Sequence, residues 1–101
     1  MRVGVTLALI LAANLATADE TTDAKAAQCE ALGGVVDQIV VLRQEGKREN
    51  RAIRTLTKGK SAIDESLQPA VQFLAGWVYA MSENELTFEP GAKYAEACKA
   101  Q

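Results

Sequence analysis

The sequence predicts an all-α fold, a small bundle of four or five helices closed by one disulfide. Apolar residues recur every three or four positions along most of the chain, which is typical of amphipathic helices. No stretch alternates apolar and polar residues with a period of two, as a half-buried strand does. The two cysteines, Cys29 and Cys98, lie near the two ends of this region, so that a bond between them would join the first helix to the last.

The first 18 residues have the pattern of a cleavable secretory signal peptide. Arg2 precedes an uncharged apolar run, and Ala16-Thr17-Ala18 fits the small-x-small cleavage site. The uncharged run has 16 residues, fewer than the roughly 20 that cross a bilayer as a helix. The alternative is an uncleaved membrane anchor. We expect residues 1–18 to be a signal peptide and residues 19–101 one helical domain, periplasmic or secreted and without a membrane span after cleavage.

The cysteines fit an exported protein of this size. Cleavage leaves 83 residues, near the margin at which core burial alone gives little stability. In an oxidising compartment, Cys29 and Cys98 are expected to form a disulfide, and the alternative is two buried thiols. A metal site is not expected, because the chain has no histidine and no Cys-x-x-Cys pattern.

The first helix is predicted from about Thr22 or Asp23 to Gln44. Gly33-Gly34 weakens the pattern, and either close packing of another helix or a kink would explain the pair. We expect one continuous helix that ends before Gly46. Five residues recur at helical spacing: Cys29, Leu32, Val36, Ile39 and, in the last turn, Arg43. The apolar stripe of this helix is widened by Val35, Val40 and Leu42.

Two further helices are predicted in the middle of the chain. Residues 47–58 form a short polar helix, with Ala52, Ile53 and Leu56 facing the core and Gly59 closing it. Ser61 is the predicted N-cap of the next helix. Its apolar stripe includes Trp77 as a core residue and comprises Ile63, Leu67, Ala70, Val71, Leu74, Trp77, Val78 and Met81.

Pro69 interrupts this stripe. Either one helix ends near Ser66 and another begins at Pro69, or the helix kinks there, and we expect the break. A polar link at residues 82–85 then leads to the last helix, predicted from about Phe88 to Lys99. Thr87 is its expected N-cap, with Pro90 in the first turn. Phe88, Ala95 and Cys98 are expected to face inward, with Tyr94 at the rim.

Catalysis is not expected, and neither is a cofactor. Without histidine, the commonest general base near neutral pH is missing, and so is the usual partner of a nucleophilic serine or cysteine. The carboxylate pairs Asp64-Glu65 and Glu83 with Glu85 have spacings that do not face each other on a helix. They are better explained as caps and solvated loop residues.

A basic segment is the best functional candidate. After cleavage the net charge is −3, yet residues 43–60 carry +5 and the remainder −8. On a helix over residues 47–58, several of these cations would form one charged face that could bind a partner protein or an anionic envelope component. The alternative is a solvated helix face. Nucleic acid is not expected, because no aromatic residue interleaves the segment. The candidate binding residues are Lys47, Arg48, Arg51, Arg54 and Lys58.

Several positions resemble a loose group of small exported bacterial and phage-associated two-cysteine helical proteins of unknown function. The resemblance covers about residues 29–98 and rests on the two cysteines, Arg43-Gln44-x-Gly46 and Trp77-Val78-Tyr79-Ala80. It implies a bacterial periplasm and the Cys29–Cys98 pairing, and it brings no functional residues. The segment from Ala62 to Ala70 also resembles the periplasmic acid-activated chaperones, whose cysteine spacing differs from that found here.

These observations favour a non-enzymatic periplasmic protein that binds a protein or envelope component through the basic helix. The alternative is an acid- or stress-responsive periplasmic chaperone that exposes the stripe from Val71 to Met81. A helix that carries Phe73, Trp77 and Tyr79 leaves both a monomer and a dimer open.

Overall fold

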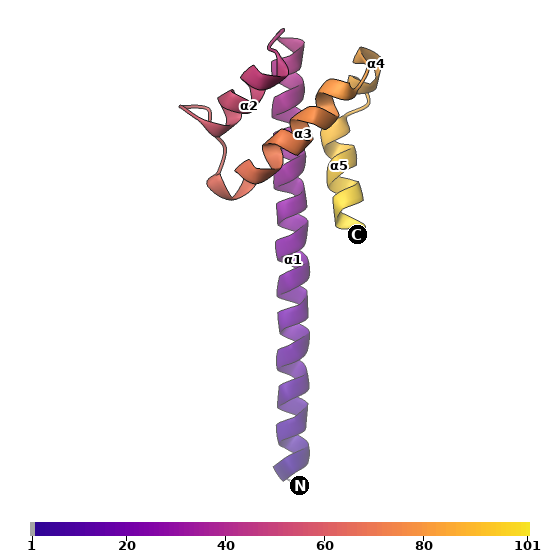
Figure 1. Ribbon diagram of the computed structural model, residues 1–101. Helices are drawn as coiled ribbons and strands as arrows, with labels where there is room; N and C mark the ends of the chain where they lie inside the picture. Colours follow the sequence, from indigo (N-terminus) through magenta and orange to yellow (C-terminus); the bar gives the residue numbers. More distant parts are fainter. Residues whose placement is uncertain (1) are drawn as a thin grey trace.

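The computed structural model describes the backbone of residues 2–101 and the side chains from Thr22 onward. Within these residues the secondary structure is helical, without strands, and a disulfide joins Cys29 to Cys98, which confirms the predicted fold (Figure 1). The elements are α1 (Arg2–Gln44), α2 (Glu49–Thr57), the 3₁₀ turn η1 (Glu65–Leu67), α3 (Gln68–Ala80), α4 (Glu83–Leu86) and α5 (Pro90–Lys99).

The long helix α1 is the axis on which the other elements pack (Figure 1). It is continuous through Gly33-Gly34, as predicted, but it begins well before Thr22. The predicted signal peptide, residues 1–18, falls where side chains lie outside the described residues, and its cleavage stays a prediction. In the part of the chain that the structure describes, no helix combines the length and apolar character needed to span a membrane.

A glycine-dependent turn ends α1. Gly46 has a φ of +89°, and its N–H donates to the carbonyl of Arg43 over 3.0 Å. The N–H of Lys47 donates to the carbonyl of Leu42, also over 3.0 Å. These two bonds are the Schellman arrangement, which satisfies the last carbonyls of a helix and favours glycine in the left-handed position. The predicted end of the first helix is therefore confirmed.

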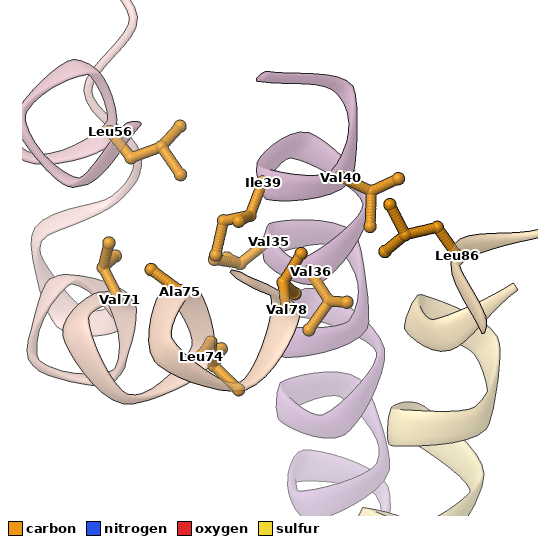
Figure 2. Close-up of a cluster of buried hydrophobic side chains, with 10 residues drawn as sticks. All are labelled: Val35, Val36, Ile39, Val40, Leu56, Val71, Leu74, Ala75, Val78 and Leu86. Atoms are coloured by element: carbon orange, nitrogen blue, oxygen red, sulfur yellow. The ribbon is translucent and has the colours of Figure 1, made fainter. Parts of the chain in front are cut away.

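The apolar core lies where α2 and α3 meet the C-terminal half of α1 (Figure 2). The buried face of α3 follows from the spacing of Val71, Leu74, Ala75 and Val78. Trp77 lies beside this face and is 38% exposed, so its prediction as a core residue was wrong. The buried cluster consists of Val35, Val36, Ile39, Val40, Leu56, Val71, Leu74, Ala75, Val78 and Leu86.

On another side of α1, α5 runs antiparallel and approaches closely (Figure 1). A Cβ atom added to Gly33 would lie 2.7 Å from the carbonyl oxygen of Gly91 and 3.1 Å from the Cβ of Ala95. The explanation of Gly33 by close helix packing is therefore confirmed, whereas a Cβ at Gly34 would meet nothing within 4 Å. The disulfide, with a Cα–Cα distance of 5.6 Å, joins the last turn of α5 to the middle part of α1.

The predicted caps in the middle of the chain need correction. Ser61 lies in a turn and caps no helix. Asp64 instead caps η1 by accepting a hydrogen bond from the Ser66 N–H over 3.3 Å. The turn η1 leads directly into α3, which begins at Gln68 with Pro69 in its first turn, where the missing N–H costs nothing. The helix expected before the proline is thus reduced to one 3₁₀ turn.

The link at residues 82–85 is also more ordered than predicted. Ser82 and Glu85 form a reciprocal capping box, which starts the one-turn helix α4. Thr87 ends α4 and does not begin α5, which starts at Pro90 after Glu89 in a left-handed conformation, φ +55°. Phe88 thus lies outside both helices and is 58% exposed, so its predicted inward orientation was wrong.

Candidate functional site

The five predicted binding residues form a basic surface on and around α2. We use the name basic surface for Lys47, Arg48, Arg51, Arg54 and Lys58, all of which are exposed. Because α2 spans only Glu49–Thr57, Lys47 lies in the turn after α1 and Lys58 follows the last helical residue. The observed helix is therefore two residues shorter at its start and one residue shorter at its end than the predicted helix over residues 47–58.

Three of the five cations converge. Arg51, Arg54 and Lys58 line one shallow hollow of about 310 Å³ together with Thr55 and Gly59. Lys47 and Arg48 are not part of its lining. Of the five predicted binding residues, the structure thus brings these three together around one hollow.

The opposite face of α2 explains why these cations point outward. Ala52 and Leu56 are fully covered, and Ile53 is half-buried against the core cluster. The Leu56 carbonyl also accepts a hydrogen bond from the Ile63 N–H over 2.9 Å, which holds the connection to η1 against the helix. With the apolar face fixed in this way, Arg51 and Arg54 have only the solvent side available.

The charge of the basic surface is not neutralised within the described residues. The ion pairs among the described residues join Lys99 to Glu30 and, at 3.2 Å, Lys99 to Glu96. These residues are far from α2 along the chain. Those two contacts raise the pKa of Lys99, the hydrogen bond to Glu30 contributing most. The carboxylate of Glu49, although on α2, lies toward α3 beside Gly76. An anion that approaches the hollow therefore meets three cations without a carboxylate partner.

Arg43 belongs to the framework and not to the basic surface. Its Nη1 donates to the Val78 carbonyl over 2.6 Å, and its guanidinium lies 5.9 Å from the centre of the Tyr79 ring. The Tyr79 hydroxyl donates in turn to the Lys47 carbonyl over 2.7 Å. Burial raises the pKa of Tyr79, partly opposed by the charge of Arg43. Arg43, Gly46 and Tyr79, on which the resemblance partly rests, thus act together to join α1 to α3.

A second candidate surface was not predicted from the sequence. It is a groove of about 340 Å³, which we call the aromatic groove, beside the exposed side of α3. Trp77 forms part of its wall and packs against Tyr94, with ring centroids 5.8 Å apart and planes tilted by 54°. The groove is lined by Trp77, Met81, Glu85, Phe88, Pro90 and Lys93. Because these residues come from three helices and two connections, no local periodicity indicates that they meet.

Neither a free thiol nor a cluster of metal-ligating side chains occurs among the described residues. Both cysteines are bonded to each other and carry no free thiol. Among the residues that the structure describes, no group of three or more histidine, cysteine, aspartate or glutamate side chains lies where it could hold a metal ion. What the arrangement can do chemically is bind an anion at the basic surface and an apolar group at the aromatic groove.

Comparisons of the chain with protein-family models, with curated proteins and with solved structures gave no match.

Proposed function

We propose that the chain is an exported, non-enzymatic binding protein that recognises an anionic partner, a protein or an envelope component, through its basic surface. The observation that carries the proposal is the hollow lined by Arg51, Arg54 and Lys58. None of these three takes part in an ion pair among the described residues. A partner that supplies carboxylates or phosphates would therefore gain charge-assisted hydrogen bonds without first breaking internal ones.

The charge distribution supports recognition over a short range. Residues 43–60 carry +5 within a chain whose other residues are acidic overall. At physiological ionic strength, charges act over about 8 Å, so the partner would sense the local cations and not the net negative charge. Electrostatic complementarity of this kind mainly raises the association rate and selects the orientation of binding.

Two observations support export. Residues 1–18 have the pattern of a signal peptide, and the Cys29–Cys98 disulfide fits a protein that folds in an oxidising compartment. We therefore propose that the mature domain starts at residue 19 and acts in the periplasm or outside the cell.

The proposal is tested by photo-crosslinking in intact cells. A photoreactive residue at Asn50, exposed on α2, should capture the partner, whereas one at Gln72, exposed on α3, should not. A protein adduct and a lipid or glycan adduct differ in mass and so distinguish a protein partner from an envelope component. Identical adducts from the two positions, or none from Asn50, would contradict the proposal.

Charge variants separate the hollow from general electrostatics. Arg51→Gln with Arg54→Gln should remove the Asn50 adduct. The matched control is Lys25→Gln with Lys60→Gln, which lowers the net charge by the same two units outside the hollow and should retain the adduct. If both double variants lost the Asn50 adduct equally, net charge alone would determine binding, and the hollow would not be the site.

A second candidate, an acid- or stress-responsive chaperone, is favoured by exposed aromatic residues on and beside α3. Phe73 is 72% exposed and Phe88 58% exposed, although both are large apolar side chains. Exposed apolar surface of this kind marks interaction sites. The chaperone proposal predicts that acid to about pH 2 increases binding of an apolar dye and removes the near-ultraviolet circular dichroism of Trp77. A rigid acid state that binds no dye would exclude it.

A further inference from the structure

The aromatic groove has the size and composition of a site for a small apolar ligand. Its volume of about 340 Å³ lies at the lower end of the range of about 300–1,000 Å³ that is usual for ligand pockets. Four of the six lining residues, Trp77, Met81, Phe88 and Pro90, offer apolar surface. Trp77 is held in place by Tyr94, so one wall of the groove is formed before any ligand arrives.

The two charged residues at the groove, Glu85 and Lys93, differ in whether they are free to pair with a charged group of a ligand. The Oε1 of Glu85 accepts a hydrogen bond from the Ser82 N–H over 2.7 Å, and this bond is the main reason that the pKa of Glu85 is lowered. Its carboxylate is thus committed to the capping box of α4. Lys93 is exposed and takes part in no ion pair of the described residues. The group at the groove that is available to pair with a charged ligand is therefore the Lys93 ammonium, while Glu85 keeps its negative charge within the capping box.

We propose that the aromatic groove binds a single-chain alkyl carboxylate, with the alkyl chain on Trp77 and Phe88 and the carboxylate paired with Lys93. None of the six lining residues is a serine, threonine, asparagine or glutamine. A peptide in the groove would bring backbone N–H and C=O groups that need partners there, whereas an alkyl chain brings none. A water molecule takes about 30 Å³ and a methylene group is of similar size, so the groove holds roughly eleven such groups. Decanoate is therefore the probe of matching length.

Trp77 makes the test direct, because it is the single tryptophan of the chain. A terminally brominated decanoate, kept below its micelle concentration, should quench the Trp77 fluorescence in a saturable manner, since bromine quenches only in contact. Unlabelled decanoate should reverse the quenching. Octanoate should compete about tenfold less well than decanoate, as two methylene groups fewer are buried. Decyltrimethylammonium, with the same chain and the opposite charge, should compete about tenfold less well also.

Variants then assign the contacts. Lys93→Glu exchanges an attraction for a repulsion and should weaken decanoate about tenfold, without weakening decyltrimethylammonium. Phe88→Ala should weaken both ligands. The matched control is Phe73→Ala, which removes an aromatic ring from α3 outside the groove and should change neither affinity. All three positions are exposed, so far-ultraviolet circular dichroism should show an unchanged fold.

Four outcomes would overturn the proposal. One is the absence of quenching at millimolar brominated decanoate. Another is equal affinity for the carboxylate and the quaternary amine, which would mean that Lys93 does not select the head group. The third is an equal loss in Phe73→Ala and Phe88→Ala, which would place the ligand on the outer face of α3. The fourth is a dimer in sedimentation that decanoate dissociates, because the groove would then belong to an interface between two copies.

Discussion

The two contact faces of α1 are held by different interactions. Toward α2 and α3, α1 presents branched apolar side chains such as Ile39, which is fully buried with Leu74 and its neighbours (Figure 2). Toward α5, it presents Gly33 to the backbone of Gly91, and a disulfide joins the helices further along. One face is stabilised by burying large apolar side chains, and the other by backbone contact and a covalent bond.

This difference shows how a small domain can add a helix that buries little apolar area. The buried residues of α5 are Pro90, Gly91 and Ala95, none of which is large. Burying apolar surface stabilises a fold by about 25 cal/mol per Å², so these small residues contribute little to the free energy of unfolding. The disulfide offsets this deficit by restricting the unfolded chain. We therefore expect α5 to depend on the disulfide and the α2–α3 side to depend on packing.

Removing the disulfide should have the largest effect. For cysteines 69 residues apart, the chain-entropy model gives a loss of about 4 kcal/mol in the free energy of unfolding for Cys29→Ala with Cys98→Ala. Urea denaturation measures the loss, and hydrogen exchange locates it. Amides of α5 should lose protection while those of α3 near Leu74 keep theirs. Uniform loss of protection would show that the two faces do not differ in the way proposed.

A core truncation should weaken the other face. Leu74→Ala leaves a cavity at a fully buried position and should lower the free energy of unfolding by about 3 kcal/mol. Its neighbour Phe73, which is largely exposed, is the control, and Phe73→Ala should change stability by no more than about 0.5 kcal/mol. Similar losses in the two variants would contradict the assignment of the buried face of α3.

The two adjacent glycines of α1 should respond with opposite signs. Gly33→Ala places a Cβ against the backbone of Gly91, which can yield only if α5 moves, and should destabilise the protein by about 2 kcal/mol. Gly34→Ala meets open space and should stabilise it by about 0.5–1 kcal/mol through helix propensity. Thermal unfolding of the two single variants measures both signs. Stabilisation by Gly33→Ala would mean that α5 does not lie as close as described.

The smallest expected effect is a pH dependence of the α1–α5 face. Because Glu30 and Glu96 raise the pKa of Lys99, the folded state holds this proton more tightly than the unfolded state. The contribution of Lys99 to stability is therefore complete below its unfolded pKa of about 10.4 and is lost as the pH rises through the folded value. Lys99→Gln should reduce the loss of stability in this alkaline range, measured by urea denaturation at several pH values. An unchanged alkaline profile would show that the ion pair contributes nothing.

The sequence predicted those parts of the fold that depend on a local backbone requirement. Gly46 marked the end of α1, and Pro69 marked the first turn of α3, since each limits the conformations that its own segment can adopt. The prediction of Trp77 as a core residue was wrong for a different reason. More apolar residues follow helical spacing on α3 than its contact face can cover, and only the packing against α1 decides which of them are buried. The capping signal from Ser82 to Glu85 was present in the sequence and was missed.

The candidate sites show the same limit. Exposure of the basic residues followed from their charge. Their grouping depends on where α2 ends, because Lys58 is the C-cap of α2 and lines the hollow with Arg51 and Arg54, whereas Lys47 does not. The aromatic groove joins Trp77 to Phe88 across α4, a contact that no spacing along one helix could indicate. Sites assembled from separate elements require the tertiary arrangement.

The disulfide also changes what a single cut in the backbone would do. Cys29 and Cys98 close the chain into a covalent ring with a tail at each end, and the ring contains α2, α3 and α4. The connection from Lys58 to Ser61 is exposed and offers two lysines to a trypsin-like protease. A nick there would open the ring without dividing the molecule. The nicked protein would keep its full mass, plus one water, until a reductant released the two fragments.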